Sequence, residues 1–174
     1  MSVSTSPSWY VIYTKPRHEK KVAEHLGYLN LQCFLPTMRT LKMWSTRKKY
    51  MITPLFPSYL FVKLDNTQQY FESLQIPGVM YYVKTGNKIA EVSERLIHKI
   101  RTILAGDAES VEVIGERILP GSVQNIRSGP FAGHDCEIVE HKGKHKMLVR
   151  IELLQRSIMV DLPIESLAET PSFN

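Results

Sequence analysis

The segment from Pro54 to Val62 is the part of this sequence that most limits how the chain can fold. It reads Pro-Leu-Phe-Pro-Ser-Tyr-Leu-Phe-Val and contains no charged residue. In a β-strand, Tyr59 and Phe61 lie on one face and Leu60 and Val62 on the other. Because both faces are then apolar, we expect a sheet that is covered by helices on one side and by a partner, or by the chain's own core, on the other.

Charge is unevenly distributed along the 174 residues. Residues 1–106 contain 15 Lys and Arg against 6 Asp and Glu, whereas residues 107–174 contain 7 against 11. A basic first part favours a polyanionic partner such as nucleic acid, and an acidic second part favours a different role. The alternative is a solvated surface on which the charges cluster by chance.

Several functional classes are disfavoured by what the sequence lacks. No apolar run approaches the roughly 20 residues of a membrane span, and the N-terminus does not resemble a secretory signal. Cys33 and Cys136 lie too far apart for a paired-cysteine zinc motif and are typical of reduced thiols in a cytoplasmic protein. The histidines show no metal-ligand spacing, and there is no phosphate-binding glycine loop. We therefore expect no metal, no cofactor, no membrane partner and no enzymatic activity.

Residues 8–106 alternate between strand-like and helix-like patterns. The expected elements are a strand at 9–13, a helix opened by Pro16, a hairpin between 31 and 52 with its tip at 45–49, a strand at 58–64, a short helix capped by Asp65 and Asn66, a strand at 79–83, and a helix from Ser93 to Gly106. The expected inward side chains are Val22, Ala23, Leu26 and Leu29 in the first helix, and Tyr70, Phe71 and Leu74 in the second. This order predicts an α+β sandwich with helices packed on a mainly antiparallel sheet.

The residues after 106 show a different pattern of apolar and polar positions. Residues 107–117 show no clear period and carry four acids, which indicates a linker. From 118 to 170, short apolar runs separated by glycine- and proline-containing turns predict a small five-stranded β-barrel. Residues 146–154 alternate in part like a strand but also permit a helical interpretation, and their valine and isoleucine favour the strand.

Two motifs in this order resemble one protein family. The first is Trp9-Tyr10-Val11-Ile12-Tyr13-x-Lys15 before a basic helix, together with the apolar segment 54–62, and the second is Pro120-Gly121-x-Val123-x-x-Ile126-x-x-Gly129-Pro130-Phe131-Ala132-Gly133. They resemble the N-terminal domain and the C-terminal KOW motif of NusG-type transcription elongation and antitermination factors. The resemblance implies an N-terminal NusG (NGN) domain at 8–106, the linker at 107–117 and a KOW domain at 118–170.

The residues of the first motif are more similar to those of the specialised RfaH-like and UpxY-like paralogues than to those of the general factor. The general factor tends to carry Pro-Gly-Tyr where this chain has Pro57-Ser58-Tyr59. Three departures remain. Residues 68–72 lack the His-Thr-Thr element with which RfaH-like factors touch the polymerase gate loop, and Gln155-Arg156 stands where the family has Gly-Arg. The loop after Phe131, at 132–135, lacks the second aromatic residue that many members have.

The resemblance implies that an apolar patch binds the clamp helices of the RNA polymerase β′ subunit. The residues it assigns to polymerase binding are Tyr13, Phe56, Tyr59, Phe61, Val79, Tyr81, Ile97 and Ile100. The alternative for each is a core position, and a helix stripe such as that of Ile97 and Ile100 is most often core.

A second set of residues is basic. Lysine and arginine contact phosphates without reading sequence. Beside a polymerase they would reach upstream DNA or the non-template strand, with Trp44 and Tyr50 available to stack on bases. The residues expected to bind nucleic acid are Lys15, Arg17, His18, Lys20, Lys21, His25, Arg47, Lys48 and Lys49.

In the KOW part, the resemblance implies a face that recruits ribosomal protein S10 or the termination factor Rho. The residues expected on this face are Ile126, Phe131 and Leu148, although Phe131 is equally explained as a core residue. Three other readings stay open: a general housekeeping factor, a free-standing KOW-type RNA-binding module, and a relative whose C-terminal segment forms a helical hairpin that masks the polymerase patch.

Overall fold

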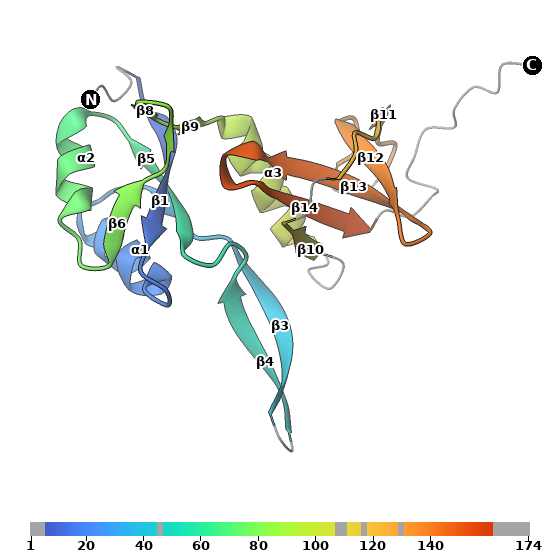
Figure 1. Cartoon of the computed structure of the whole chain (residues 1–174), viewed down its shortest axis with the longest axis horizontal. Helices are drawn as coiled ribbons and strands as arrows, with labels where there is room; N and C mark the ends of the chain where they lie inside the picture. Colours follow the sequence, from blue (N-terminus) through green and yellow to red (C-terminus); the bar gives the residue numbers. More distant parts are fainter. Residues whose placement is uncertain (1–5, 45–46, 107–110, 116–117, 129–130, 162–174) are drawn as a thin grey trace, which may run out of the picture. The chain divides into compact units, whose positions relative to one another are not determined.

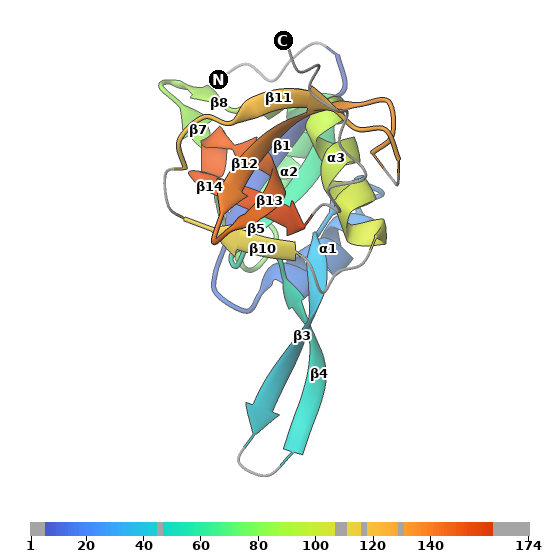
Figure 2. The same ribbon diagram turned by 90° about the vertical axis from the view of Figure 1, so that its right-hand side faces the viewer.

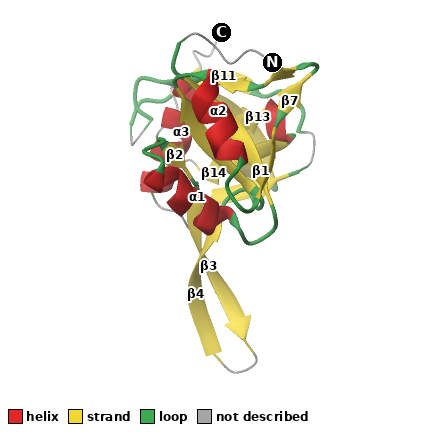
Figure 3. Cartoon of the chain, turned by 90° about the vertical axis from the view of Figure 1, so that its left-hand side faces the viewer, coloured by secondary structure: helices red, strands yellow, loops and turns green. Residues whose placement is uncertain are grey.

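The computed structural model describes residues 6–44, 47–106, 111–115, 118–128 and 131–161. The chain divides into two compact units, residues 1–104 and 105–174 (Figure 1). The three α-helices among the described residues occur before residue 106, and the described elements after it are strands and one short 3₁₀-helix (Figure 3). Among all the residues that the structure describes, no helix has the length and apolar character needed to cross a bilayer.

The first unit is built on one antiparallel sheet, as predicted. Its strands are β1 (Ser8–Thr14), β2 (Cys33–Phe34), β5 (Tyr59–Leu64), β6 (Val79–Tyr82) and β9 (Glu91–Val92). Their order is β2-β5-β1-β6, and β9 also pairs with β1. The central strand β1 therefore has neighbours on both sides, which explains why it carries an uninterrupted apolar run.

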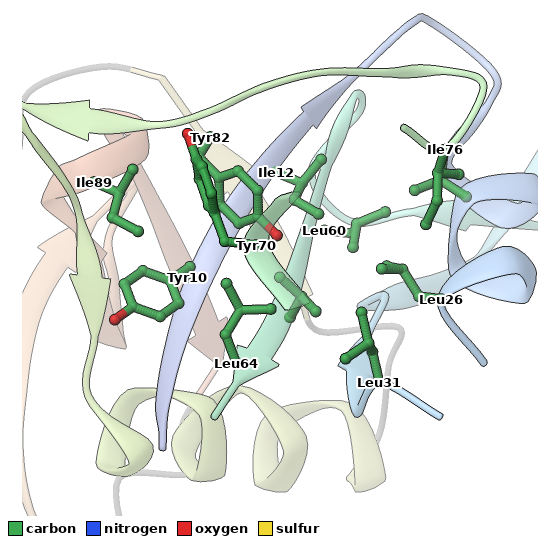
Figure 4. Packing of buried hydrophobic residues seen from close by; sticks show 12 residues of the cluster. Tyr10, Ile12, Leu26, Leu31, Leu60, Leu64, Tyr70, Ile76, Tyr82 and Ile89 are labelled. Carbon is green, nitrogen blue, oxygen red and sulfur yellow. The ribbon is translucent and has the colours of Figure 1, made fainter. Parts of the chain in front are cut away.

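One face of this sheet is covered by α1 (Glu19–Tyr28) and α2 (Thr67–Leu74). Tyr10 and Ile12 of β1 lie on this face with Leu60 of β5, and Figure 4 shows them packed between side chains of the two helices. Leu60 was predicted to point inward, and the structure confirms it. Burial of this cluster removes most of its apolar surface from water, which is the main force that stabilises the unit.

Helix α3 (Glu94–Ala105) lies against the residues of the opposite face. The Trp9 indole donates a hydrogen bond of 2.7 Å to Glu94, and the Arg101 guanidinium lies over the rings of Trp9 and Phe34. Ser93 caps the helix as predicted, because its hydroxyl accepts a hydrogen bond from the Leu96 amide. Helices of the same unit thus pack against part of each face of the sheet.

Three details of the helices differ from the prediction. Leu29, predicted to face inward in the first helix, follows the end of α1 and is exposed. Helix α1 begins at Glu19 rather than at Pro16, because Arg17 has φ of 66°, which interrupts a right-handed helix. Helix α2 is capped by the Asn66 side chain as expected, but Phe71 points outward and is 56% exposed. In so short a helix, Tyr70 alone takes the inward aromatic position.

The predicted hairpin is present as a separate two-stranded sheet. It consists of β3 (Thr37–Trp44) and β4 (Arg47–Pro54), paired in register from Thr37 with Pro54 to Trp44 with Arg47. Figure 1 and Figure 2 show it projecting away from the sheet of its unit. Arg47, Lys48 and Lys49, which were predicted at the tip, belong to strand β4, and residues 45–46 lie outside the described part of the chain. A second small hairpin joins β7 (Lys84–Thr85) and β8 (Lys88–Ile89).

The second unit contains a five-stranded antiparallel sheet, where the sequence predicted a small five-stranded β-barrel within residues 118–170. Its elements are β10 (Val111–Ile114), β11 (Ser122–Asn125), β12 (Asp135–His141), β13 (Lys144–Ile151), η2 (Glu152–Leu154) and β14 (Arg156–Asp161). The strand order is β10-β14-β13-β12-β11. The strand interpretation of residues 146–151 is confirmed, and only 152–154 turn into a helix.

The predicted linker at 107–117 is wrong over part of its length. Val111–Ile114 forms strand β10 and pairs with β14 from Val111 opposite Val160 to Ile114 opposite Ser157. The segment carries apolar residues at alternate positions, Val111 and Val113, which suits an edge strand, but the neighbouring acids obscured this short period. Residues 107–110 and 116–117 lie outside the described part of the chain.

Candidate protein- and nucleic-acid-binding surface

Three tyrosines line up across adjacent strands of the first sheet. Tyr13 of β1 is paired in register with Tyr59 of β5 on one side and with Tyr81 of β6 on the other. The ring centroids of Tyr13 and Tyr59 are 5.1 Å apart, and those of Tyr13 and Tyr81 are 4.9 Å apart. We call these three residues the tyrosine ladder. Cross-strand aromatic pairs of this kind also stabilise the sheet.

The tyrosine ladder is only partly covered. Tyr13 and Tyr59 are half-buried, and Tyr81 is 50% exposed. Tyrosine presents a rigid apolar body with a polar end, and such residues dominate the energetics of protein interfaces. Val79, at the start of the same strand as Tyr81, is half-buried. These four residues were all predicted as polymerase contacts, and the fold brings them to one region of three adjacent strands.

The other four predicted polymerase contacts are buried in this structure. Phe61 has no exposed surface and stacks on Phe34, and Phe56 packs edge-on against Phe61. Ile97 and Ile100 of α3 are also fully buried. Phe34 and Phe56 of the same unit pack against Phe61, and its assignment to polymerase binding stays a prediction. A strand pattern shows that a face is apolar but not which element covers it.

The predicted basic residues of the N-terminal helix region lie at the surface. Lys15, Arg17, Lys20, Lys21 and His25 are exposed, and His18 is half-buried. The Lys20 ammonium donates a hydrogen bond of 3.3 Å to the Ile52 carbonyl of β4. Helix α1 is thereby joined to the base of the β3–β4 hairpin, so both basic segments belong to one stretch of surface.

Register divides the hairpin into two faces, which the sequence alone did not reveal. Leu41 lies opposite Tyr50 and Met43 opposite Lys48, so these four share one face. The basic residues Arg47 and Lys49 belong to the other face. Arg47, Lys48 and Lys49 are all exposed. Residues 37–54 contain no acid at all, so the whole hairpin carries positive charge.

Arg39 is a candidate site residue that the motif search missed. Its guanidinium lies 4.0 Å from the centre of the Tyr50 ring, and both side chains are exposed. A cation held on an aromatic ring is a suitable platform for a nucleic-acid base or phosphate. The cross-strand distance from Arg39 to Tyr50 becomes visible only once the register is known, because the two residues are far apart in sequence.

The three residues predicted as the KOW docking face are buried. Ile126, Phe131 and Leu148 belong to the interior, and Leu148 packs in a cluster with Val139 and Met159. Each of these residues is buried here, and their assignment to a partner-binding face stays a prediction. The sequence argument left this alternative open for Phe131, since a bulky residue beside a turn fits either role.

A charged cluster fixes one edge of the second unit. Arg150 donates two hydrogen bonds to Glu137, of 2.8 and 3.0 Å, and the Gly121 amide donates a third of 2.9 Å. The hydrogen bonds from Arg150, and to a lesser extent that from Gly121, hold the pKa of Glu137 below its ordinary value. The cluster ties the loop before β11 to strands β12 and β13.

Replacing Glu137 with glutamine is expected to change how stability depends on pH. A carboxyl whose pKa is lowered by folding stabilises the fold above its unfolded pKa of about 4.3, and this contribution is lost as the pH falls through the lower folded pKa. Glu137→Gln should therefore lower the free energy of unfolding by about 1 kcal/mol at pH 7, with the difference shrinking toward pH 3. Hydrogen exchange of strands β12 and β13 between pH 3 and 7 measures this, with exposed Glu140→Gln as the control. A difference that grows toward acid pH would contradict the assignment.

The described residues provide no evident metal site. In the described ranges, no group of three or more His, Cys, Asp or Glu side chains is placed to hold a metal ion. Cys33 and Cys136 are free thiols, and burial raises the pKa of the Cys33 thiol. The chemistry that these surfaces offer is binding through aromatic and basic side chains.

Comparison with known proteins identifies the family. The family described as "Transcription termination factor nusG" matches residues 7–101, a region that contains both the tyrosine ladder and the basic hairpin. The chain belongs to the NusG family. The resemblance seen in the sequence is confirmed at this level.

Individual relatives extend the match beyond the first unit. The NusG-family chain is 24% identical over 177 residues to the transcription termination/antitermination protein NusG of Lactococcus lactis subsp. lactis (strain IL1403), covering 96% of this chain and 95% of that protein. It is also 24% identical over 170 residues to the protein of the same name from Staphylococcus aureus (strain Mu50 / ATCC 700699), covering 91% and 93%. Among solved structures, NusG of Thermotoga maritima matches with a TM-score of 0.50 and 26% identity, over 93% of this chain and 96% of that one. The α+β fold is thus that of NusG.

Proposed function

We propose that this NusG-family protein is a non-enzymatic transcription elongation and antitermination factor that binds RNA polymerase through its first unit. The observation that carries the proposal is the tyrosine ladder, a partly exposed aromatic row next to a basic surface in the region matched by the family. Its partner is the pair of clamp helices of the polymerase β′ subunit. Val79 adjoins the ladder, whereas Phe56, Phe61, Ile97 and Ile100 are buried.

Binding of this kind acts by shifting populations rather than by chemistry. A factor that binds a closed clamp more tightly than an open one lowers the fraction of paused or terminating complexes. A preference of about 1.4 kcal/mol for the closed state changes that ratio about tenfold. No cofactor or metal is needed for this mechanism, and it operates in the cytoplasm, where the polymerase is.

The basic surface contributes a second contact, to upstream DNA or the non-template strand. Its proposed members are the basic residues of the α1 region together with Arg47, Lys48 and Lys49. Support comes from the hydrogen bond between Lys20 and Ile52, which places the helix beside the hairpin, and from the absence of acids in residues 37–54. Contacts of lysine to phosphate add affinity without sequence preference.

Removing two hairpin lysines is expected to flatten the salt dependence of DNA binding. Each lost phosphate contact lowers the slope of log K against log salt by about 0.9 on duplex DNA, so Lys48→Ala with Lys49→Ala should lower it by about 2. Titration of a labelled duplex over a range of salt concentrations measures the slope. The matched control is Lys84→Ala with Lys88→Ala, two exposed lysines of the β7–β8 hairpin. Equal slopes for both pairs would remove the β3–β4 hairpin from the DNA-binding surface.

The second unit is proposed to recruit a further protein, ribosomal protein S10 or Rho, while the first holds the polymerase. Tethering raises the effective concentration of the recruited partner. The acidic balance of residues 107–174 supports a protein partner over RNA, which disfavours the reading as a free-standing RNA-binding module. Binding of purified S10 and Rho to the full chain, each measured against an rRNA fragment, distinguishes these partners.

We further propose that the protein serves particular operons, as RfaH-like and UpxY-like factors do. The support is Ser58, which stands where the general factor carries glycine. Mapping the occupancy of the tagged protein on the genome tests this. Occupancy at one or a few loci supports a specialised factor, whereas occupancy on most transcribed genes indicates a general housekeeping factor.

A further inference from the structure

A buried carboxylate joins the start of helix α1 to the turn before strand β5. Glu19, the first residue of α1, is only 5% exposed, and its Oε1 accepts a hydrogen bond of 2.7 Å from the Ser58 amide. Ser58 is itself buried and has φ of 67°, in the left-handed region that a non-glycine residue adopts only at a cost. The hydrogen bond that the Ser58 amide donates to Glu19 therefore offsets a conformation that serine disfavours.

The turn held by Glu19 is connected to two members of the tyrosine ladder, Tyr13 and Tyr59. The Ser58 carbonyl accepts a hydrogen bond of 2.8 Å from Thr14, the residue that follows Tyr13. The next residue after Ser58 is Tyr59, whose amide closes the turn on the Phe56 carbonyl at 3.1 Å. Both Tyr13 and Tyr59 are thus one residue away from groups that the Ser58 turn fixes.

We propose that Glu19 is a positioning residue for polymerase binding: it holds the Ser58 turn and thereby sets the tyrosine ladder in a fixed relation to the basic surface of α1. This inference rests on the proposed function. Glu19 precedes Lys20 and Lys21 in the same helical turn, so one side chain couples the two surfaces. A ladder held rigid before binding loses less conformational entropy on docking, which raises affinity. A carboxylate at a helix N-terminus is also favoured by the helix dipole.

Four variants of the full chain separate positioning from simple stability. Glu19→Ala removes the acceptor and should weaken binding to purified core RNA polymerase at least tenfold. Glu19→Gln keeps an oxygen that can accept from the Ser58 amide and should stay within about threefold of the wild type. Glu19→Asp shortens the side chain by one methylene and should fall between the two. Ser58→Gly combined with Glu19→Ala should restore binding, because glycine adopts positive φ without a tether.

The matched control is Asn66→Ala. Asn66 likewise accepts a hydrogen bond from a backbone amide at a helix start, at 3.0 Å from the Gln69 nitrogen, but it caps α2 rather than α1. It should lower thermal stability without changing polymerase affinity. Hydrogen exchange at residues 56–59 is the second readout, and it should rise in Glu19→Ala but not in Asn66→Ala.

Each outcome tests either the positioning role of Glu19 or the proposed binding to polymerase. Unchanged exchange at 56–59 in Glu19→Ala overturns the inference, as does a loss of affinity in Asn66→Ala equal to that in Glu19→Ala. If Glu19→Ala does not fold, full affinity in a folded Glu19→Asp variant with increased exchange at 56–59 overturns it as well. If the wild-type chain itself fails to bind polymerase, the proposed function fails, and the exchange data still report whether Glu19 holds the turn.

Discussion

Replacing Tyr59 and Tyr81 together with alanine is expected to weaken binding to RNA polymerase by about 100-fold, the effect of losing one or two hot-spot aromatics. Both side chains reach the surface, and both rings contact Tyr13, so their loss removes the two outer members of the tyrosine ladder. Affinity for purified core polymerase, measured by biolayer interferometry or a comparable assay, gives the change directly.

The control for this prediction is Tyr28→Ala. Tyr28 is an exposed tyrosine of the same unit but lies at the end of α1, and its hydroxyl donates a hydrogen bond to Glu24. It should leave polymerase affinity unchanged. If the double variant retained wild-type affinity while folded, the ladder would not be the polymerase-binding surface, and the proposal would lose its main contact.

Phe61→Ala is expected to lower the free energy of unfolding of the first unit by about 3–5 kcal/mol, as deletion of a buried phenyl ring does. Phe61 has no exposed surface and packs on Phe34 and Phe56. Both tryptophans of the chain, Trp9 and Trp44, lie in residues 1–104. Denaturant titration followed by tryptophan fluorescence therefore reports on this unit alone.

Phe71→Ala serves as the matched control for Phe61→Ala. It removes the same ring from the same unit, but Phe71 is exposed on α2, so the expected loss is below about 1 kcal/mol. The pair distinguishes the two roles considered for Phe61. A Phe61→Ala variant of normal stability that fails to bind polymerase would show that Phe61 contacts polymerase, as the sequence motif alone predicted.

Local patterns were sufficient for most of the elements. The continuous apolar run that ends at Val62 indicated a strand with two apolar faces, and the spacing of Ile97, Ile100 and Ile103 indicated helix α3. Capping by Asn66 and Ser93 was also readable, because such caps depend on neighbouring residues in sequence. Starts and ends were less predictable: α1 begins three residues late because the φ angle of Arg17 is set by its surroundings.

The residues of the candidate site could be predicted only in part from the sequence. The motif pointed to Tyr13, Tyr59 and Tyr81 together with Phe56 and Phe61, although the first group reaches the surface and the second does not. No sequence pattern indicated that Arg39 or Glu19 belongs to the site. Arg39 meets Tyr50 through strand register, and Glu19 meets Ser58 across 39 positions of sequence. Such contacts depend on long-range pairing, which residue type and spacing do not encode locally.

The sequence by itself determined the family, the α+β character of the first unit, the strands of the second and the location of the basic residues. Each of these depends on side-chain periodicity or on motifs within a few tens of residues. The tertiary structure decided which apolar residues are core and which are available to a partner. It did so because a side chain's exposure is set by the elements packed over it, and those come from distant parts of the chain.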